Sequence, residues 1–117
     1  MKDRHGSLEN EILNVVWQLE EALRSEDTDI SVNKIYQIMN EQNTTRAYTT
    51  IKTVMDRLVE KNILKRAKIG KKFCYSSTSS RTQMASKAIQ KLAHQYFHDD
   101  IRQLMRAIEK ESLQVTY

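Results

Sequence analysis

The sequence has few of the residues that build turns and loops. Proline is absent and glycine occurs only twice in 117 residues, where average usage gives roughly 6 prolines and 8 glycines. Because β-sandwiches and loop-built sites need many turn residues, the composition favours a mainly helical protein. No apolar run approaches the ~18 residues that span a bilayer, and the first ten residues lack a signal-peptide core. We therefore expect a cytoplasmic protein with no membrane contact.

Sites that need thiols or glycine-rich loops are also missing. The only cysteine is Cys74, which excludes an internal disulfide and a CxxC metal site. Since Gly6 and Gly70 are the only glycines, most phosphate-binding loops are excluded, and GxSxG, HExxH and paired-carboxylate motifs are absent. We expect no enzyme activity and no cofactor. Cys74 falls on a presumed strand, where we expect a buried small side chain rather than a redox role.

Two histidines are the remaining candidates for a metal site. His94 and His98 are one helical turn apart and are followed by Asp99 and Asp100, so both imidazoles would share a face. The alternative is a polar face of a helix. No further cysteine or histidine lies nearby in the sequence, and we therefore predict no metal site.

Positive charge is concentrated in one stretch of the chain. Residues 44–72 hold nine Lys or Arg against two acidic residues, whereas residues 7–43 hold eight acidic residues against two basic ones. This concentration indicates contact with a polyanion, and the alternative is a solvated basic loop.

Apolar residues at helical spacing predict three N-terminal helices, over 7–23, from a Ser31 N-cap to about residue 42, and from Tyr48 through Val59. Polar segments 24–29 and 43–45 separate them. Two β-compatible segments, 63–68 and 72–76, then flank a turn that contains Gly70 and predict a hairpin. We expect Phe73 and Tyr75, on one face of the second strand, to fix the hairpin to the helical core rather than to stack on bases.

This order of elements is typical of a winged helix-turn-helix domain, in which the third helix enters the major groove and the hairpin follows the backbone. We assign residues 1–78 to a winged-helix domain and residues 79–117, after the serine-rich segment 76–80, to a helical dimerisation region. Two short amphipathic helices within 81–111 are too few to bury a core alone, so a second copy is their simplest partner, and folding back on the winged domain is the alternative. The residues expected at the dimer contact are Met84, Ala88, Leu92, Tyr96, Ile101, Leu104, Met105 and Ile108.

The exposed side of the third helix carries groups that suit a DNA groove. Threonine hydroxyls can bond base edges or phosphates, and Lys52 and Arg57 can reach guanine acceptors or phosphates. Capping of the helix start could account for Thr49 or Thr50 but not for Thr53. Five basic residues in the hairpin suit phosphates, which give affinity rather than sequence choice. The expected backbone contacts are Arg46, Tyr48, Arg57, Lys65, Arg66, Lys68, Lys71 and Lys72.

The run AYTTIKTVMDRLVEKNILKR, residues 47–66, continuing to FCYS at 73–76, resembles the penicillinase repressor family. The first helix, with Glu9, Ile12 and Trp17, is also similar to that family. The resemblance implies a homodimeric transcriptional repressor that binds a palindromic operator. It also implies that Thr49, Thr50, Lys52 and Thr53 read the bases. Two features found within the family are missing here: the paired CxC motifs of copper-responsive members, and the Asn-Phe bond at which an inactivating protease cuts others.

Two other functions compete with repression. A winged helix can act as a protein-protein interaction module that uses its basic face for an acidic partner, although such a site needs no cluster of threonine hydroxyls. A helical RNA-binding protein is the third candidate, but the sequence lacks the surface aromatics that stack unpaired bases.

Overall fold

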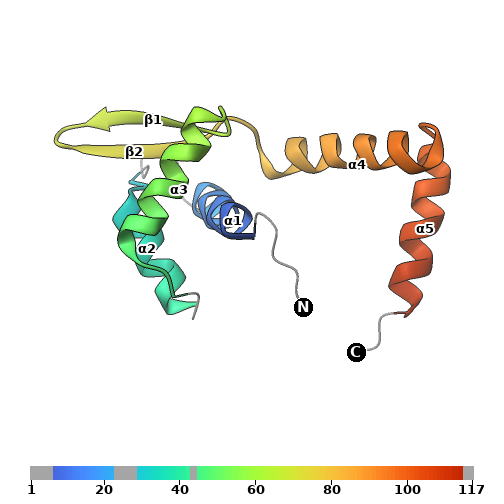
Figure 1. Cartoon of the computed structure of the whole chain (residues 1–117), viewed down its shortest axis with the longest axis horizontal. Coiled ribbons are helices and arrows are strands. Elements are labelled where there is room, and N and C mark those ends of the chain that lie inside the picture. The colour runs from blue at the N-terminus through green and yellow to red at the C-terminus, as the bar shows by residue number, and fades with distance from the viewer. Residues whose placement is uncertain (1–6, 23–28, 43–44, 115–117) are drawn as a thin grey trace. The chain divides into compact units, whose positions relative to one another are not determined.

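The computed structural model describes residues 7–22, 29–42 and 45–114 and contains, within them, five helices and one two-stranded sheet (Figure 1). The chain divides into two compact units, Met1–Ser80 and Arg81–Tyr117. The expected mainly helical winged fold is confirmed, while most of the predicted loop 24–29 and turn 43–45 lies outside the described residues. The elements are α1 (Ser7–Ala22), α2 (Val32–Glu41), α3 (Tyr48–Glu60), β1 (Leu64–Ile69), β2 (Lys72–Ser77), α4 (Arg81–Phe97) and α5 (Ile101–Gln114).

The first unit has one hydrophobic core, which α1, α2 and α3 form by packing against one another. Each helix contributes the apolar stripe that its sequence spacing predicts, and burying these side chains drives the packing. The side chains with the least exposure are Ile12, Val16, Ile35, Met39, Ile51, Met55, Leu58 and Leu64.

The two helices of the helix-turn-helix begin differently. Ser31 caps α2 as predicted, because its Oγ accepts a hydrogen bond from the Lys34 backbone N–H at 3.1 Å. The N-cap of α3 is Ala47, and no side chain caps this helix. Capping therefore does not explain the threonines at 49 and 50, whose hydroxyls are exposed on the first turn of α3.

The hairpin follows α3 directly and packs against the helices. Leu64 pairs with Ser77 and Ile69 with Lys72, and a two-residue turn joins the strands. Gly70 has φ +66° in this turn, a left-handed conformation that glycine adopts without a Cβ penalty. Strand β1 contacts α3 and β2 contacts α1, while the Tyr75 N–H donates to the Ile30 carbonyl at 2.8 Å. The wing is thus fixed at its base.

The two aromatic residues of β2 have different surroundings. Tyr75 is 3% exposed and lies in the core, as expected. Phe73 is 46% exposed, and the Arg66 guanidinium lies 4.7 Å from the centre of its ring. The expectation that Phe73 fixes the hairpin to the core is wrong, because the strand residues next to the turn, Phe73 among them, are exposed and only residues further from the turn are buried.

The end of β2 and the residues that follow it are hydrogen-bonded to α1 and to the segment between α3 and β1. The Glu20 carboxylate accepts hydrogen bonds from the Ser77 N–H and hydroxyl, both at 2.7 Å. The Trp17 indole N–H donates to the Ser79 carbonyl at 3.0 Å, and the Thr78 hydroxyl donates to the Asn62 carbonyl at 2.7 Å. These bonds attach the end of the first unit to its core.

The second unit consists of α4 and α5, which contact each other. Asp99 has φ +68° in the connection and donates its N–H to the Ala93 carbonyl at 2.9 Å. The carboxylate of Asp100 then accepts a hydrogen bond from the Arg102 N–H at 3.0 Å, which caps the start of α5.

Candidate nucleic-acid interface

Helix α3 has one buried face and one exposed polar face. Ile51, Val54, Met55 and Leu58 are buried in the core. The side chains expected to read bases, Thr49, Thr50, Lys52 and Thr53, are all exposed, and so is Arg57. The same 3.6-residue period that buries the apolar stripe therefore directs the hydroxyls and the ammonium to solvent.

The start of α3 carries two more of the expected contacts. Tyr48 is 42% exposed, and its ring packs edge-on against Tyr36 of α2 with 5.7 Å between ring centres. Arg46 is exposed and donates to the Thr45 carbonyl at 2.9 Å. The Tyr48 hydroxyl is thus on a ring that α2 holds in place.

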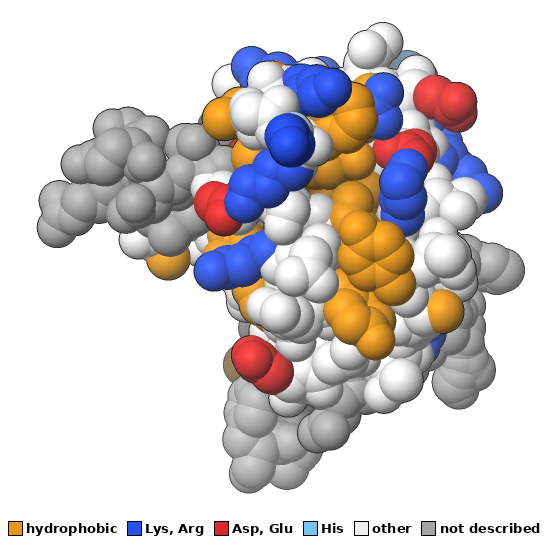
Figure 2. All heavy atoms as spheres, turned by 90° about the vertical axis from the view of Figure 1, so that its left-hand side faces the viewer, with side chains coloured by type: hydrophobic (Ala, Val, Ile, Leu, Met, Phe, Trp, Pro, Cys, Tyr) orange, Lys and Arg blue, Asp and Glu red, His pale blue; other side chains and the backbone are white. Residues whose placement is uncertain are grey.

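The wing presents its cations to solvent. Lys65, Arg66, Lys68, Lys71 and Lys72 are all exposed. In Figure 2, Lys and Arg side chains gather over the upper part of the visible face, at the level of the hairpin in Figure 1. We call these five residues, together with Lys52 and Arg57 on the exposed side of α3, the basic surface.

Two aspartates pair with cations of this surface. Asp56 on α3 binds Lys52 Nζ at 2.9 Å and Arg66 Nη1 at 3.0 Å, and it accepts a hydrogen bond from the Tyr75 hydroxyl at 3.3 Å. Asp29, ahead of α2, binds Lys72 Nζ at 2.9 Å. Other cations have no ion pair within the described part of the chain: Arg57, Lys65, Lys68 and Lys71.

These contacts shift several pKa values. Burial by itself raises the pKa of Asp56, but the hydrogen bonds from Lys52 and Tyr75 and the charges of Lys52 and Arg66 outweigh it and hold the pKa below its usual value. The hydrogen bond to Asp56 raises the pKa of Lys52. Burial raises the pKa of the Tyr75 hydroxyl, so this group stays protonated and can donate to Asp56 at neutral pH.

The sequence of the chain was compared with models of known protein families. The family model described as penicillinase repressor matches residues 5–116, which is nearly the whole chain. The chain belongs to the penicillinase repressor family. The repressor is therefore a DNA-binding regulator of transcription with a winged-helix fold, as the resemblance of residues 47–76 implied. Among curated proteins, no match to the repressor was found.

One residue that pairs with cations of the basic surface was not among the predicted site residues. Asp56 joins α3 to both strands of the wing. Its spacing of four residues from Lys52 is a sequence signal for an ion pair on a helix. The contacts to Arg66 and Tyr75 had no local signal, because ten and nineteen residues separate them from Asp56.

The residues expected at the dimer contact have unequal exposure. Leu92, Tyr96, Ile101, Met105 and Ile108 are between 42% and 70% exposed, and Ala88 is exposed as well. Met84 is half-buried, while Leu104 is only 5% exposed within the single chain. Within α4 and α5, two large apolar residues outside the expected set are also exposed, Ile89 and Leu113.

The two histidines and the cysteine do not form a cluster of ligands. Helix α4 ends at Phe97, and His98 has φ +50°, so the i, i+4 geometry expected for His94 and His98 is interrupted. His94 Nδ1 lies 3.1 Å from Asp99 Oδ1 instead. The described residues contain no group of three or more His, Cys, Asp or Glu that could hold a metal ion. Cys74 is buried, with its sulfur 3.9 Å from Asp29 Oδ1.

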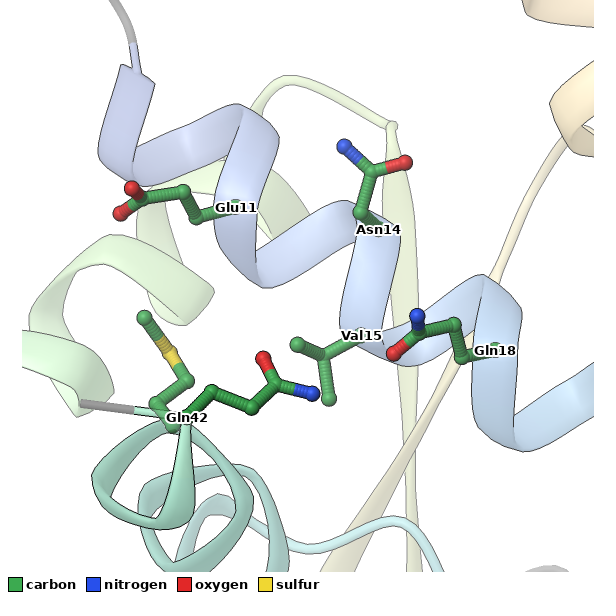
Figure 3. A pocket seen from close by; sticks show the side chains of 6 residues that line it. Glu11, Asn14, Val15, Gln18 and Gln42 are labelled. Atoms are coloured by element: carbon green, nitrogen blue, oxygen red, sulfur yellow. The ribbon is translucent and has the colours of Figure 1, made fainter. Parts of the chain in front are cut away.

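A small cavity of about 160 Å³ lies between α1 and α2 (Figure 3). It is lined by Glu11, Asn14, Val15, Gln18, Met39 and Gln42. Pockets for small molecules usually measure about 300–1,000 Å³, so this one is undersized, and no residue of α3 or the wing lines it. None of the described helices has both the length and the apolar character that crossing a bilayer requires.

Proposed function

We propose that the repressor binds a palindromic operator as a homodimer. Helix α3 of each copy enters the major groove, where Thr49, Thr50, Lys52 and Thr53 contact base edges. The wing lies along the sugar-phosphate backbone, where its lysines and Arg66 neutralise phosphates. Repression follows because the bound dimer occludes the promoter.

The observation that carries this proposal is the position of the hydroxyls relative to the cations. Thr49, Thr50 and Thr53 lie on the solvent side of a helix whose opposite side is the core. The ion pair between Asp56 and Arg66 connects that helix to the wing, so hydroxyls and cations belong to adjoining parts of one surface. A sequence-specific site for duplex DNA requires groups that contact bases next to groups that contact phosphates.

Dimerisation is supported by the apolar side chains of α4 and α5. Leu92, Tyr96, Met105 and Ile108 are between 44% and 70% exposed, and a soluble monomer rarely leaves so many large apolar groups in water. A symmetric contact between two copies covers the same patch on each and places two α3 helices on successive half-sites of an operator.

Selection from a randomised duplex library, followed by anisotropy titration, tests the proposal. We expect the selected sites to be palindromes and a scrambled duplex of equal length to bind at least about a thousandfold more weakly at physiological salt. Equal affinity for selected and scrambled duplexes would refute sequence-specific binding. It would favour the protein-protein interaction module, which predicts a stable complex with an acidic partner in a pull-down.

A further inference from the structure

Asp56 is an acidic group in the middle of a surface that otherwise suits DNA. Its two carboxylate oxygens are shared between Lys52 of α3, at 2.9 Å, and Arg66 of β1, at 3.0 Å. The Tyr75 hydroxyl of β2 donates to the same oxygen as Arg66, at 3.3 Å. One carboxylate therefore holds a base-reading residue and a phosphate-binding residue together.

This arrangement reduces the charge available to phosphates. Lys52, Arg66 and Asp56 together carry one net positive charge instead of two. The side chains of Lys52, Asp56 and Arg66 are 53%, 33% and 36% exposed, and ion pairs this exposed contribute little to stability. Stability of the fold is thus a poor reason for a carboxylate at a site that meets a polyanion.

Both cations are also restrained in position. The guanidinium of Arg66 lies between Asp56 and the ring of Phe73, 4.7 Å from the ring centre. Lys52 has three N–H donors, of which one bonds Asp56. The remaining donors lie on the exposed face of α3.

We propose that Asp56 is a positioning residue that gives the repressor its sequence selectivity by suppressing binding to DNA of arbitrary sequence. Non-specific binding relies on mobile cations that follow phosphates. Lys52 and Arg66 can do this only after leaving Asp56, whereas on the operator Lys52 donates to a base while it keeps this ion pair. The inference rests on the proposed function, because it assumes that Lys52 faces base edges.

The test compares Asp56→Asn with Asp29→Asn and the unchanged protein. Asp29 is the matched control because it also neutralises a wing cation, Lys72, but its hydrogen-bond partners both lie on β2. Each substitution removes one negative charge, so a general charge effect acts equally in both variants. Anisotropy titrations with a scrambled duplex and with the selected operator, at several salt concentrations, give affinities and salt slopes. Circular dichroism checks that each variant folds.

We expect Asp56→Asn to free two cations and Asp29→Asn to free one. With a slope of about −0.9 per phosphate contact, the salt dependence on scrambled duplex should steepen by about 1.8 and about 0.9 respectively. Asp56→Asn should also bind scrambled duplex about tenfold more tightly at moderate salt and lower the ratio of operator to scrambled affinity. Asp29→Asn should leave that ratio unchanged, since Lys72 contacts backbone only.

Equal slopes and equal ratios in the two variants would overturn the inference, and so would weaker binding of Asp56→Asn to both duplexes. The salt dependence of binding to scrambled duplex can be measured without knowing the operator sequence. If selection from the randomised library yields no preferred sequence, the proposed function is refuted. If selection yields a preferred sequence but Asp56→Asn leaves the salt slope unchanged, only the proposed role of Asp56 is refuted.

Discussion

Single aspartates determine how much charge this repressor offers to DNA. Asp56 pairs with Lys52 and Arg66, and Asp29 pairs with Lys72, so three of the expected DNA contacts already have an acidic partner in the free protein. Arg57, Lys65, Lys68 and Lys71 have no ion pair within the described residues. At the residue scale the basic surface therefore contains two kinds of cation, restrained and unrestrained.

The restrained and unrestrained lysines should respond differently to truncation. Lys52→Ala should cost about 1–3 kcal/mol on the operator and relax the base preference, because it removes a base contact. Lys71→Ala should weaken all duplexes alike and reduce the salt slope by about 1, because it removes a phosphate contact. Anisotropy titrations with operator and scrambled duplex measure both. A uniform loss for Lys52→Ala would show that it binds only backbone.

The Asp56 contacts should also make stability depend on pH. The pKa of Asp56 is lowered in the folded protein, so its contribution is present at neutral pH and is lost as pH falls below about 4, through the folded pKa. We expect the free energy of unfolding of the unchanged protein to exceed that of Asp56→Asn by less than about 1 kcal/mol at pH 7. Urea titrations at pH 7 and pH 3 measure this gap, which should be smaller at pH 3. An equal difference in the free energy of unfolding at pH 7 and pH 3 would contradict the conclusion that ionised Asp56 stabilises the fold.

At the element scale, the two helices of the helix-turn-helix differ in how they begin. Helix α2 begins at Ser31, whose hydroxyl bonds the Lys34 N–H. Helix α3 begins at Ala47 without a side-chain cap, and its first turn carries Thr49 and Thr50 in solvent. The α3 N-terminus is therefore stabilised by packing of Ile51 and Met55 rather than by capping.

Removing the one well-formed cap in the helix-turn-helix should destabilise the winged unit. We expect Ser31→Ala to lower the free energy of unfolding by about 1 kcal/mol, because the Lys34 N–H loses its acceptor. Ser86→Ala, at an exposed position inside α4, is the control and should be neutral or slightly stabilising. Urea denaturation followed by circular dichroism compares them. Equal effects of the two substitutions would mean that the Ser31 bond contributes nothing.

At the scale of the whole molecule, we propose that one unit binds DNA and the other forms the dimer. The unit Met1–Ser80 holds the groups for DNA, and the unit Arg81–Tyr117 holds exposed apolar residues suited to a second copy. The bonds of Trp17 and Glu20 to residues 77–79 fix where the first unit ends.

A charge placed on the apolar face of α4 should separate the dimer. We expect Leu92→Glu to shift the protein toward monomer and to weaken binding to a palindrome far more than to a single half-site, because avidity between half-sites is lost. Gln90→Glu adds the same group at an exposed polar position of α4 and should remain dimeric. Analytical ultracentrifugation and anisotropy measure the two effects. A Leu92→Glu dimer of unchanged stability would place the contact elsewhere.

The sequence by itself determined the elements and the character of the DNA surface. Apolar spacing predicted the helices, Gly70 marked the turn, and the charge of residues 44–72 located the basic side, because periodicity, turn geometry and net charge are local properties.

Tertiary structure decided which residues meet. Phe73 lies in solvent against Arg66 rather than in the core, and Asp56 binds groups on two strands that follow it by ten and nineteen residues. Such contacts depend on where the hairpin crosses α3 and on how far it projects beyond the helices. Packing of the whole unit sets that geometry, and no local pattern encodes it.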